Sequence, residues 1–302
     1  MEVLSGSSII FIIKVFGAFL GLITNILINN WYGEKVLGTL DIINSFFAIC
    51  TIFTLMGTST SVLRLIPEYL TKYSILSAYY IYKKIAYLVF FSSVTISILV
   101  YFNSHIISDY IFAKPHLKIV LSFAALIIVF KTFQKFTIST LRAIKNIKAF
   151  SLIQFLIPLA NFIFIIIVFN FFPFNKSISN IRYDPIYISF AISILFSIIG
   201  IIIVNNYFKN SNNSETPTKK ITYKKIIQIS FPMFLTSSML IIIGKVSILF
   251  LAANVGENEI SYFSRALKLG LLTSFMLQSI NQIIAPKFSE LYHNSEIDKL
   301  FS

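Results

Sequence analysis

Long apolar stretches recur along the whole chain, and short segments rich in Lys, Asn, Ser and Pro separate them. Several stretches reach or approach the roughly 20 residues that a helix needs to cross about 30 Å of hydrocarbon. A run such as 162–172 is apolar on every side, whereas a strand of a membrane barrel alternates apolar and polar residues. The pattern therefore predicts eight transmembrane helices, at about 9–30, 41–63, 84–103, 117–136, 151–173, 186–206, 226–252 and 263–285.

Composition excludes a water-soluble fold, because 56% of the residues are hydrophobic, 12% are charged and the mean hydropathy is +0.81. The first apolar stretch lacks the basic segment and the small-residue cleavage site of a secretion signal, so we expect it to remain as the first span. The single cysteine, Cys50, falls inside the second predicted span. This excludes a disulfide framework or a cysteine metal site.

The distribution of Lys and Arg predicts how the chain crosses the membrane, because short cytoplasmic loops are enriched in these residues. The loops after even-numbered spans hold most of the loop Lys and Arg, and the loops after odd-numbered spans hold few. We therefore expect a multi-pass protein of the cell membrane with both termini in the cytoplasm. The same distribution explains much of the net charge of +13, so the charge does not indicate nucleic-acid binding.

The most polar stretch, 209–225, has the Asn, Ser, Pro and Lys content of a solvated linker. We interpret it as a cytoplasmic linker between an N-terminal six-helix lobe, 1–208, and the start of a second lobe, 226–302. A weak internal repeat agrees with this division, because Gly33 and Glu34 align with Gly256 and Glu257 when the first span is placed on the seventh. Duplicated helical units are frequent in transporters.

Six basic residues lie inside the predicted spans or near their ends: Lys14, Lys131, Lys135, Lys245, Arg265 and Lys268. A charge near mid-bilayer costs about 2.5–3.5 kcal/mol or more, so deep basic side chains should face a protein interior or a water-filled cavity. A long side chain near a span end can instead place its ammonium at the interface. That alternative applies above all to Lys131, Lys135 and Lys268.

One face of the first span carries small and polar residues at steps of three or four: Lys14, Ala18, Gly21, Asn25 and Asn29. Such a stripe either lines an aqueous cavity or allows close helix packing, and the Lys and the two Asn favour the cavity. Acidic residues are almost absent from the spans, where only Asp41 enters. We therefore expect a pathway that suits an anionic substrate.

No enzymatic pattern is present in the sequence. There is no glycine-rich phosphate loop, no nucleophile elbow, no pair of carboxylates on one helix and no metal-ligand spacing. The three histidines, His105, His116 and His293, are too scattered for a metal or catalytic cluster, and we assign them no role. The sequence therefore predicts a protein that is not an enzyme, with no catalytic residue, no cofactor and no metal.

Four motifs, in this order, resemble the polysaccharide biosynthesis family, the lipid-linked oligosaccharide flippases that include O-antigen flippases. This family is part of the multidrug/oligosaccharidyl-lipid/polysaccharide (MOP) exporter superfamily, which also holds the multidrug and toxic compound extrusion (MATE) transporters. The motifs are the first span and turn at 5–38, SVLRLIPEY at 61–69, SFPMFLTSSMLIIIG at 230–244 and INQIIAPKFSELY at 280–292.

The resemblance implies an all-α, MATE-like helical bundle whose two six-helix lobes enclose a V-shaped cavity. It further implies alternating access and transport of a polyprenyl-diphosphate-linked oligosaccharide, with basic cavity residues holding the anionic head group. Arg64 falls on the arginine of the family's Arg-x-x-Pro-Glu pattern, although it equally suits a cytoplasmic topology anchor. The candidate substrate-binding residues are Lys14, Asn25, Arg64, Lys245 and Arg265.

The chain departs from the family in two ways. Many members carry Trp-x-Asp where this sequence has Lys245, Val246 and Ser247, which puts a cation-coupling role at that position in doubt. A two-lobe member needs at least twelve spans, so eight spans correspond to one six-helix lobe plus the first two helices of a second. We therefore expect the remaining C-terminal helices to come from a partner chain or a longer reading frame.

Two other functions are compatible with the sequence. One is a MATE-like exporter of drugs and organic cations, which the scarcity of membrane carboxylates disfavours. The other is a non-transporting membrane scaffold for glycosyltransferases. The partners expected for the favoured function are a lipid-linked anionic saccharide and membrane lipids.

Overall fold

The computed structural model describes residues 2–171, 182–210 and 221–270, except for the side chains of 2–12, 14 and 210. This part of the chain is helical throughout, with short turns and no strand. Seven of its helices are long and apolar enough to cross a membrane, which confirms the all-α membrane fold. They are α1 (Glu2–Tyr32), α2 (Glu34–Leu55), α4 (Ile75–Phe102), α6 (Lys118–Ala143), α7 (Ile147–Phe171), α8 (Asp184–Asn210) and α9 (Tyr223–Asn254).

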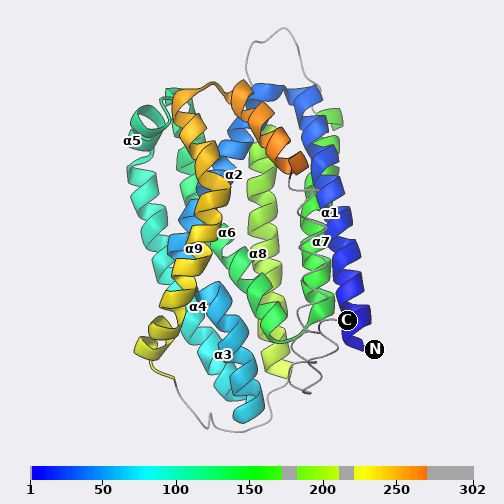
Figure 1. Cartoon of the computed structure of the whole chain (residues 1–302), viewed down its shortest axis with the longest axis vertical. Helices are drawn as coiled ribbons and strands as arrows, with labels where there is room; N and C mark the ends of the chain where they lie inside the picture. Colours follow the sequence, from blue (N-terminus) through cyan, green and yellow to red (C-terminus); the bar gives the residue numbers. More distant parts are fainter. Residues whose placement is uncertain (1, 172–181, 211–220, 271–302) are drawn as a thin grey trace, which may run out of the picture.

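The long helices run up and down between two ends of the bundle (Figure 1). The upper end in that view holds the turn at Gly33, the segment 103–117 and the break at 255–256. The lower end holds the turns at 73–74 and 144–146 and the start of α9. The described turns at 73–74 and 144–146 and the start of α9, which belong to or border loops that the sequence predicts to be cytoplasmic, therefore share the lower end.

A helical segment at 257–270 follows α9 at the upper end. It contains the beginning of the eighth predicted span. The rest of that span, most of the linker and the tail after Pro286 lie outside the described residues. The division into two lobes stays a prediction.

The second predicted span, 41–63, is wrong as a single helix. The chain leaves the α conformation after Leu55, where Met56 (φ 45) and Gly57 (φ 76) adopt left-handed backbone angles. A new helix, α3 (Thr58–Lys72), then begins, and the Thr58 hydroxyl donates to the Leu55 carbonyl at 2.6 Å. Glycine takes a positive φ without the steric cost of a Cβ atom, so Gly57 permits this break.

The remaining short elements cover the upper end between α4 and α6. They are α5 (Ser104–Ile106), the π-helical turn η1 (Ile107–Ile111) and the 3-10 turn η2 (Pro115–Leu117). The Phe112 side chain of this segment is buried in the upper core. The segment thereby places Lys114 and His116 beside the end of α9.

The most deeply buried of the spans is α2. It packs against α1, α4, α6 and α9, and its apolar side chains join two clusters of buried residues. Its buried hydroxyls mostly bond within the helix, as when Thr39 donates to the Lys35 carbonyl at 2.9 Å. This internal pairing satisfies most of the polar groups that α2 buries against neighbouring helices, while the Ser45 hydroxyl and one carboxylate oxygen of Asp41 have no hydrogen-bond partner among the described residues.

Two glycines of this region bring separate backbones into contact. A Cβ atom on Gly38 would overlap the backbone of Glu257, and one on Gly57 would overlap the backbone of Ser230 and Phe234. The α9 helix and the segment 257–270 can therefore approach α2 only because these positions carry no side chain.

We expect Gly38→Ala and Gly57→Ala each to destabilise the protein by about 1–3 kcal/mol, because the added methyl group forces the backbones apart. Thermal unfolding of the purified protein in detergent measures the effect. Gly244→Ala on α9 is the matched control, since an added Cβ there meets nothing within 4 Å. Equal melting temperatures for Gly57→Ala and Gly244→Ala would contradict the close contact.

Candidate functional site

The predicted start of the second lobe, α9 and 257–270, contacts α2 and α3 of the predicted N-terminal lobe. We call this contact, together with the bordering side chains of α6 and of the segment 103–117, the seam. Figure 1 shows α9 lying along α2 and reaching α3 at the lower end. Polar side chains concentrate at two levels of the seam. One level is at the upper end, and the other is near the middle of the helices.

The upper end of the seam is capped by Lys114. This buried side chain donates from Nζ to the carbonyls of Ala252 at 2.6 Å and Val255 at 2.8 Å. The last carbonyls of a helix have no partner within it and carry its negative dipole end, so an ammonium is a favourable partner. Burial lowers the pKa of Lys114, while the charges of Glu257 and Glu259 oppose this shift.

Three further polar pairs cross the seam at and just below its upper end. His116 Nε2 donates to Glu257 Oε1 at 2.7 Å. Glu34 accepts a hydrogen bond from Tyr262 and pairs with Arg265, whose guanidinium lies 3.5 Å away. Lys268 Nζ lies 2.8 Å from the carboxylate of Asp41, which is buried. Each of these carboxylates thus has a side-chain partner from the opposite side of the seam.

The middle level has lysines with no acidic partner. Lys131, Lys135 and Lys245 form no ion pair with any described residue. Lys135 donates to the Thr51 hydroxyl at 2.6 Å, and its charge interacts with those of Lys245 and Lys131. At 1.5 Å per residue, Lys135 lies about 25 Å along α6 from its upper end. Lys245 of α9 also interacts with the charges of Asp41 and Lys268, so it lies within electrostatic range of the paired groups above.

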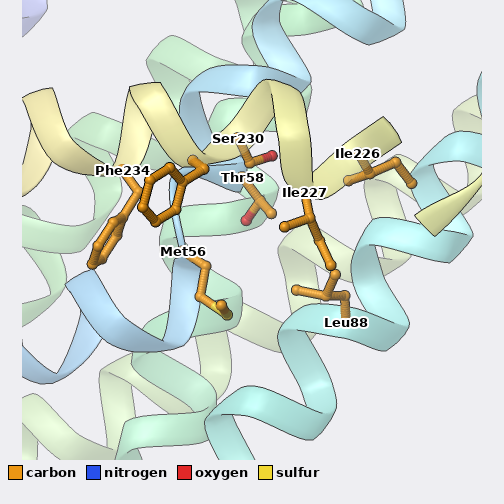
Figure 2. A pocket seen from close by; sticks show the side chains of 8 residues that line it. Met56, Thr58, Leu88, Ile226, Ile227, Ser230 and Phe234 are labelled. Carbon is orange, nitrogen blue, oxygen red and sulfur yellow. The ribbon is translucent and has the colours of Figure 1, made fainter. Parts of the chain in front are cut away.

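Hydroxyl contacts and a small apolar pocket lie below the lysines. Ser61 of α3 and Ser230 of α9 share a hydrogen bond of 2.8 Å. Figure 2 shows the pocket beside them, where Met56, Leu88 and residues of α9 surround about 70 Å³. No charged side chain lines this pocket, so it does not offer the chemistry needed for an anion.

A second polar cavity, which we call the inner cavity, lies among α1, α2, α6, α7 and α8 and measures about 260 Å³. Its polar lining residues are Thr24, Asn25, Asn44, Lys131, Asn161 and Ser189. The small-and-polar stripe of the first span therefore contributes to a cavity through Gly21 and Asn25, as one of its two interpretations predicts.

The structure distributes the five predicted substrate-binding residues over several places. Lys245 and Arg265 lie on the seam, where Arg265 is paired with Glu34. Asn25 lines the inner cavity. Arg64 is exposed on α3 in the lower half of the bundle, and the side chain of Lys14 lies outside the described residues.

Sequence reasoning missed several seam residues. On the sequence alone, Lys114 and His116 are loop residues, yet both contact the predicted start of the second lobe. The sequence explains Lys135 at least as well by snorkelling as by a functional role, because a sequence does not reveal which side of a helix meets another helix. One signal pointed to the upper contacts: the repeated Gly-Glu turns place Glu34 and Glu257 at the starts of helices, and both carboxylates pair across the seam.

Lys114→Met should destabilise the protein by about 1.5–3 kcal/mol, since it removes charged hydrogen bonds and leaves buried carbonyls of α9 without a donor. Lys118→Met is the matched control, because Lys118 is exposed and lies four residues further along. Melting temperatures in detergent compare the two variants. A Lys114→Met protein as stable as the control would show that α9 does not need this cap.

Comparison with known proteins supplies the family. No curated protein and no solved structure matches the chain. A family model described as "Polysaccharide biosynthesis protein" matches residues 3–292, which is nearly the whole sequence. This is the family of O-antigen and polysaccharide flippases of the MOP superfamily. The chain therefore belongs to the polysaccharide biosynthesis protein family.

Proposed function

We propose that this protein is a flippase that moves a polyprenyl-diphosphate-linked oligosaccharide across the cell membrane for cell-surface polysaccharide synthesis. The observation that carries the proposal is that Lys131, Lys135 and Lys245 of the membrane bundle form no ion pair with any described residue. The like charges of Lys135 and Lys245 interact unfavourably. An anionic diphosphate supplies negative charge that offsets this repulsion.

The diphosphate is the part of such a substrate that lysines recognise best. A lysine acts as a point charge that can contact either phosphate, so two lysines suit a head group that must later be released. Arg265 is held by Glu34 in this conformation and becomes available when that pair separates. Arg64, exposed in the lower half of the bundle, is placed to meet an anionic head group at the predicted cytoplasmic surface.

The upper end of the seam gives this transport a physical basis for alternating access. It is held by Lys114 on the end of α9 and by the pairs His116–Glu257, Glu34–Arg265 and Asp41–Lys268. Water can replace each of these polar contacts, so the two sides can part there at modest cost. Movement of the substrate requires no covalent step.

Two alternatives are less well supported. An exporter of organic cations needs a free carboxylate in its pathway, and in the described seam both Glu34 and Asp41 are paired with basic groups. A scaffold for glycosyltransferases needs no unpaired lysines in the membrane, where a charge is costly. A flipping measurement in vesicles also separates the scaffold, because a scaffold does not move lipid.

We expect Lys135→Gln and Lys245→Gln each to slow flipping at least about tenfold, since loss of one contact to a phosphate costs on the order of 1.5–3 kcal/mol. The measurement is translocation of a fluorescent, diphosphate-linked oligosaccharide lipid in vesicles that contain the purified protein.

The matched control is Lys224→Gln, because Lys224 is an exposed lysine at the lower end of the same helix as Lys245. Size-exclusion elution of each variant checks its folding. Wild-type flipping by both seam variants would remove the lysines from the mechanism. Absence of flipping when the wild-type chain is reconstituted together with the chain that supplies the remaining helices would contradict the proposed function itself.

A further inference from the structure

One charged side chain is found among the described residues that line the inner cavity. Its lining includes Lys131 and no carboxylate, and no described acidic group lies within ion-pair distance of this lysine. The Lys131 ammonium lies 6.0 Å from the centre of the Phe47 ring and feels the like charge of Lys135. A charge at this depth requires a counter-ion or water to offset its desolvation.

The amides of the cavity provide hydrogen-bond donors near that charge. Asn25 and Asn44 line the cavity, and their side chains form no hydrogen bond with any described residue. Each therefore keeps an N–H₂ group for a ligand. Because the two amides come from α1 and α2 and the ammonium from α6, the donors come from different helices.

Three other lining residues provide acceptors. The hydroxyls of Thr24 and Ser189 already donate to the carbonyls of Leu20 and Ile186, and the Asn161 amide uses one of its two N–H bonds on the Ile157 carbonyl. The oxygens of these side chains keep lone pairs for a ligand. A halide ion accepts hydrogen bonds but has no proton to donate, so it can pair only with the donors of such a cavity. An oxyanion that retains a hydroxyl hydrogen can use the donors and the acceptors together.

We propose that the inner cavity binds a small oxyanion that carries a hydroxyl group, of the hydrogen phosphate type, with Lys131 as its counter-charge. The volume of about 260 Å³ accommodates a tetrahedral oxyanion with some water and excludes a whole lipid-linked oligosaccharide. This site is therefore distinct from the seam, and it stands whether or not the protein flips lipids.

The chain contains its own reporter of this cavity. Trp31 is its single tryptophan, and the indole stacks on Phe169 with ring centres 4.2 Å apart. Ile28 and Ile165, about one helical turn before these two rings, line the cavity. Binding in the cavity should therefore change the fluorescence of Trp31.

The test is a titration of the purified full chain in detergent with sodium phosphate at constant ionic strength and neutral pH. We expect a saturable change in Trp31 fluorescence and a higher melting temperature, because a ligand that binds only the folded state stabilises it. Sulfate, which has no proton at this pH, and chloride should bind at least tenfold more weakly. Equal responses to phosphate and chloride would overturn the oxyanion assignment.

Variants locate the site. Lys131→Met should weaken phosphate binding at least tenfold, whereas Lys118→Met, an exposed lysine of the same helix, should bind as the wild type does. If Lys131→Met does not fold, Asn25→Leu, which removes only the amide, replaces it and should weaken binding in the same way. Wild-type binding by the folded cavity variant would overturn the proposal. A response lost in Lys245→Gln but kept in Lys131→Met would place phosphate on the seam and overturn it as well.

Discussion

The cost of a charged group inside a helical membrane bundle governs the arrangement of this protein. In such a bundle a charge must be paired, hydrated or matched by a ligand. Asp41 and Lys268 satisfy the requirement by pairing across the seam. Lys135 and Lys245 satisfy it only in part, since Lys135 donates to Thr51 and neither forms an ion pair with a described residue, although the charge of Asp41 acts on Lys245. In the proposed function this difference separates the paired charges that hold the seam from the lysines that meet the substrate.

The deep burial of α2 makes this arrangement possible. Gly38 and Gly57 allow the backbones of 257–270 and α9 to approach it closely, and the left-handed break at Met56 and Gly57 turns the chain into α3. Apolar packing around α2 fixes the N-terminal bundle, while polar pairs hold the upper end of the seam. A polar contact exchanges with water more readily than an apolar core does. The seam is therefore the part of the structure best suited to move.

The two polar regions differ in what they can hold. The seam lies where the two predicted lobes meet, so a ligand there contacts both sides and is released when they part. The inner cavity is partly open and is lined, among the described residues, by helices of the N-terminal bundle alone, with Lys131 as the one charged residue of that lining. A large substrate suits the first place and a small anion suits the second. Lys131 of the inner cavity and Lys135 of the seam lie four residues apart on α6, so this single helix borders both regions.

The sequence by itself determined the fold class, seven of the spans and the family, because apolar length and motif order are local properties of the chain. It also indicated the basic residues inside the membrane and the Gly-Glu turns. The tertiary structure alone decided which charges are paired: Arg265 and Lys268 form ion pairs with carboxylates more than 200 positions away, whereas Lys245 forms none with a described residue. It likewise showed that the second predicted span breaks at Gly57 and that Asn25 lines the inner cavity and not the seam. These outcomes depend on helix rotation and on contacts between distant segments, which hydropathy does not encode.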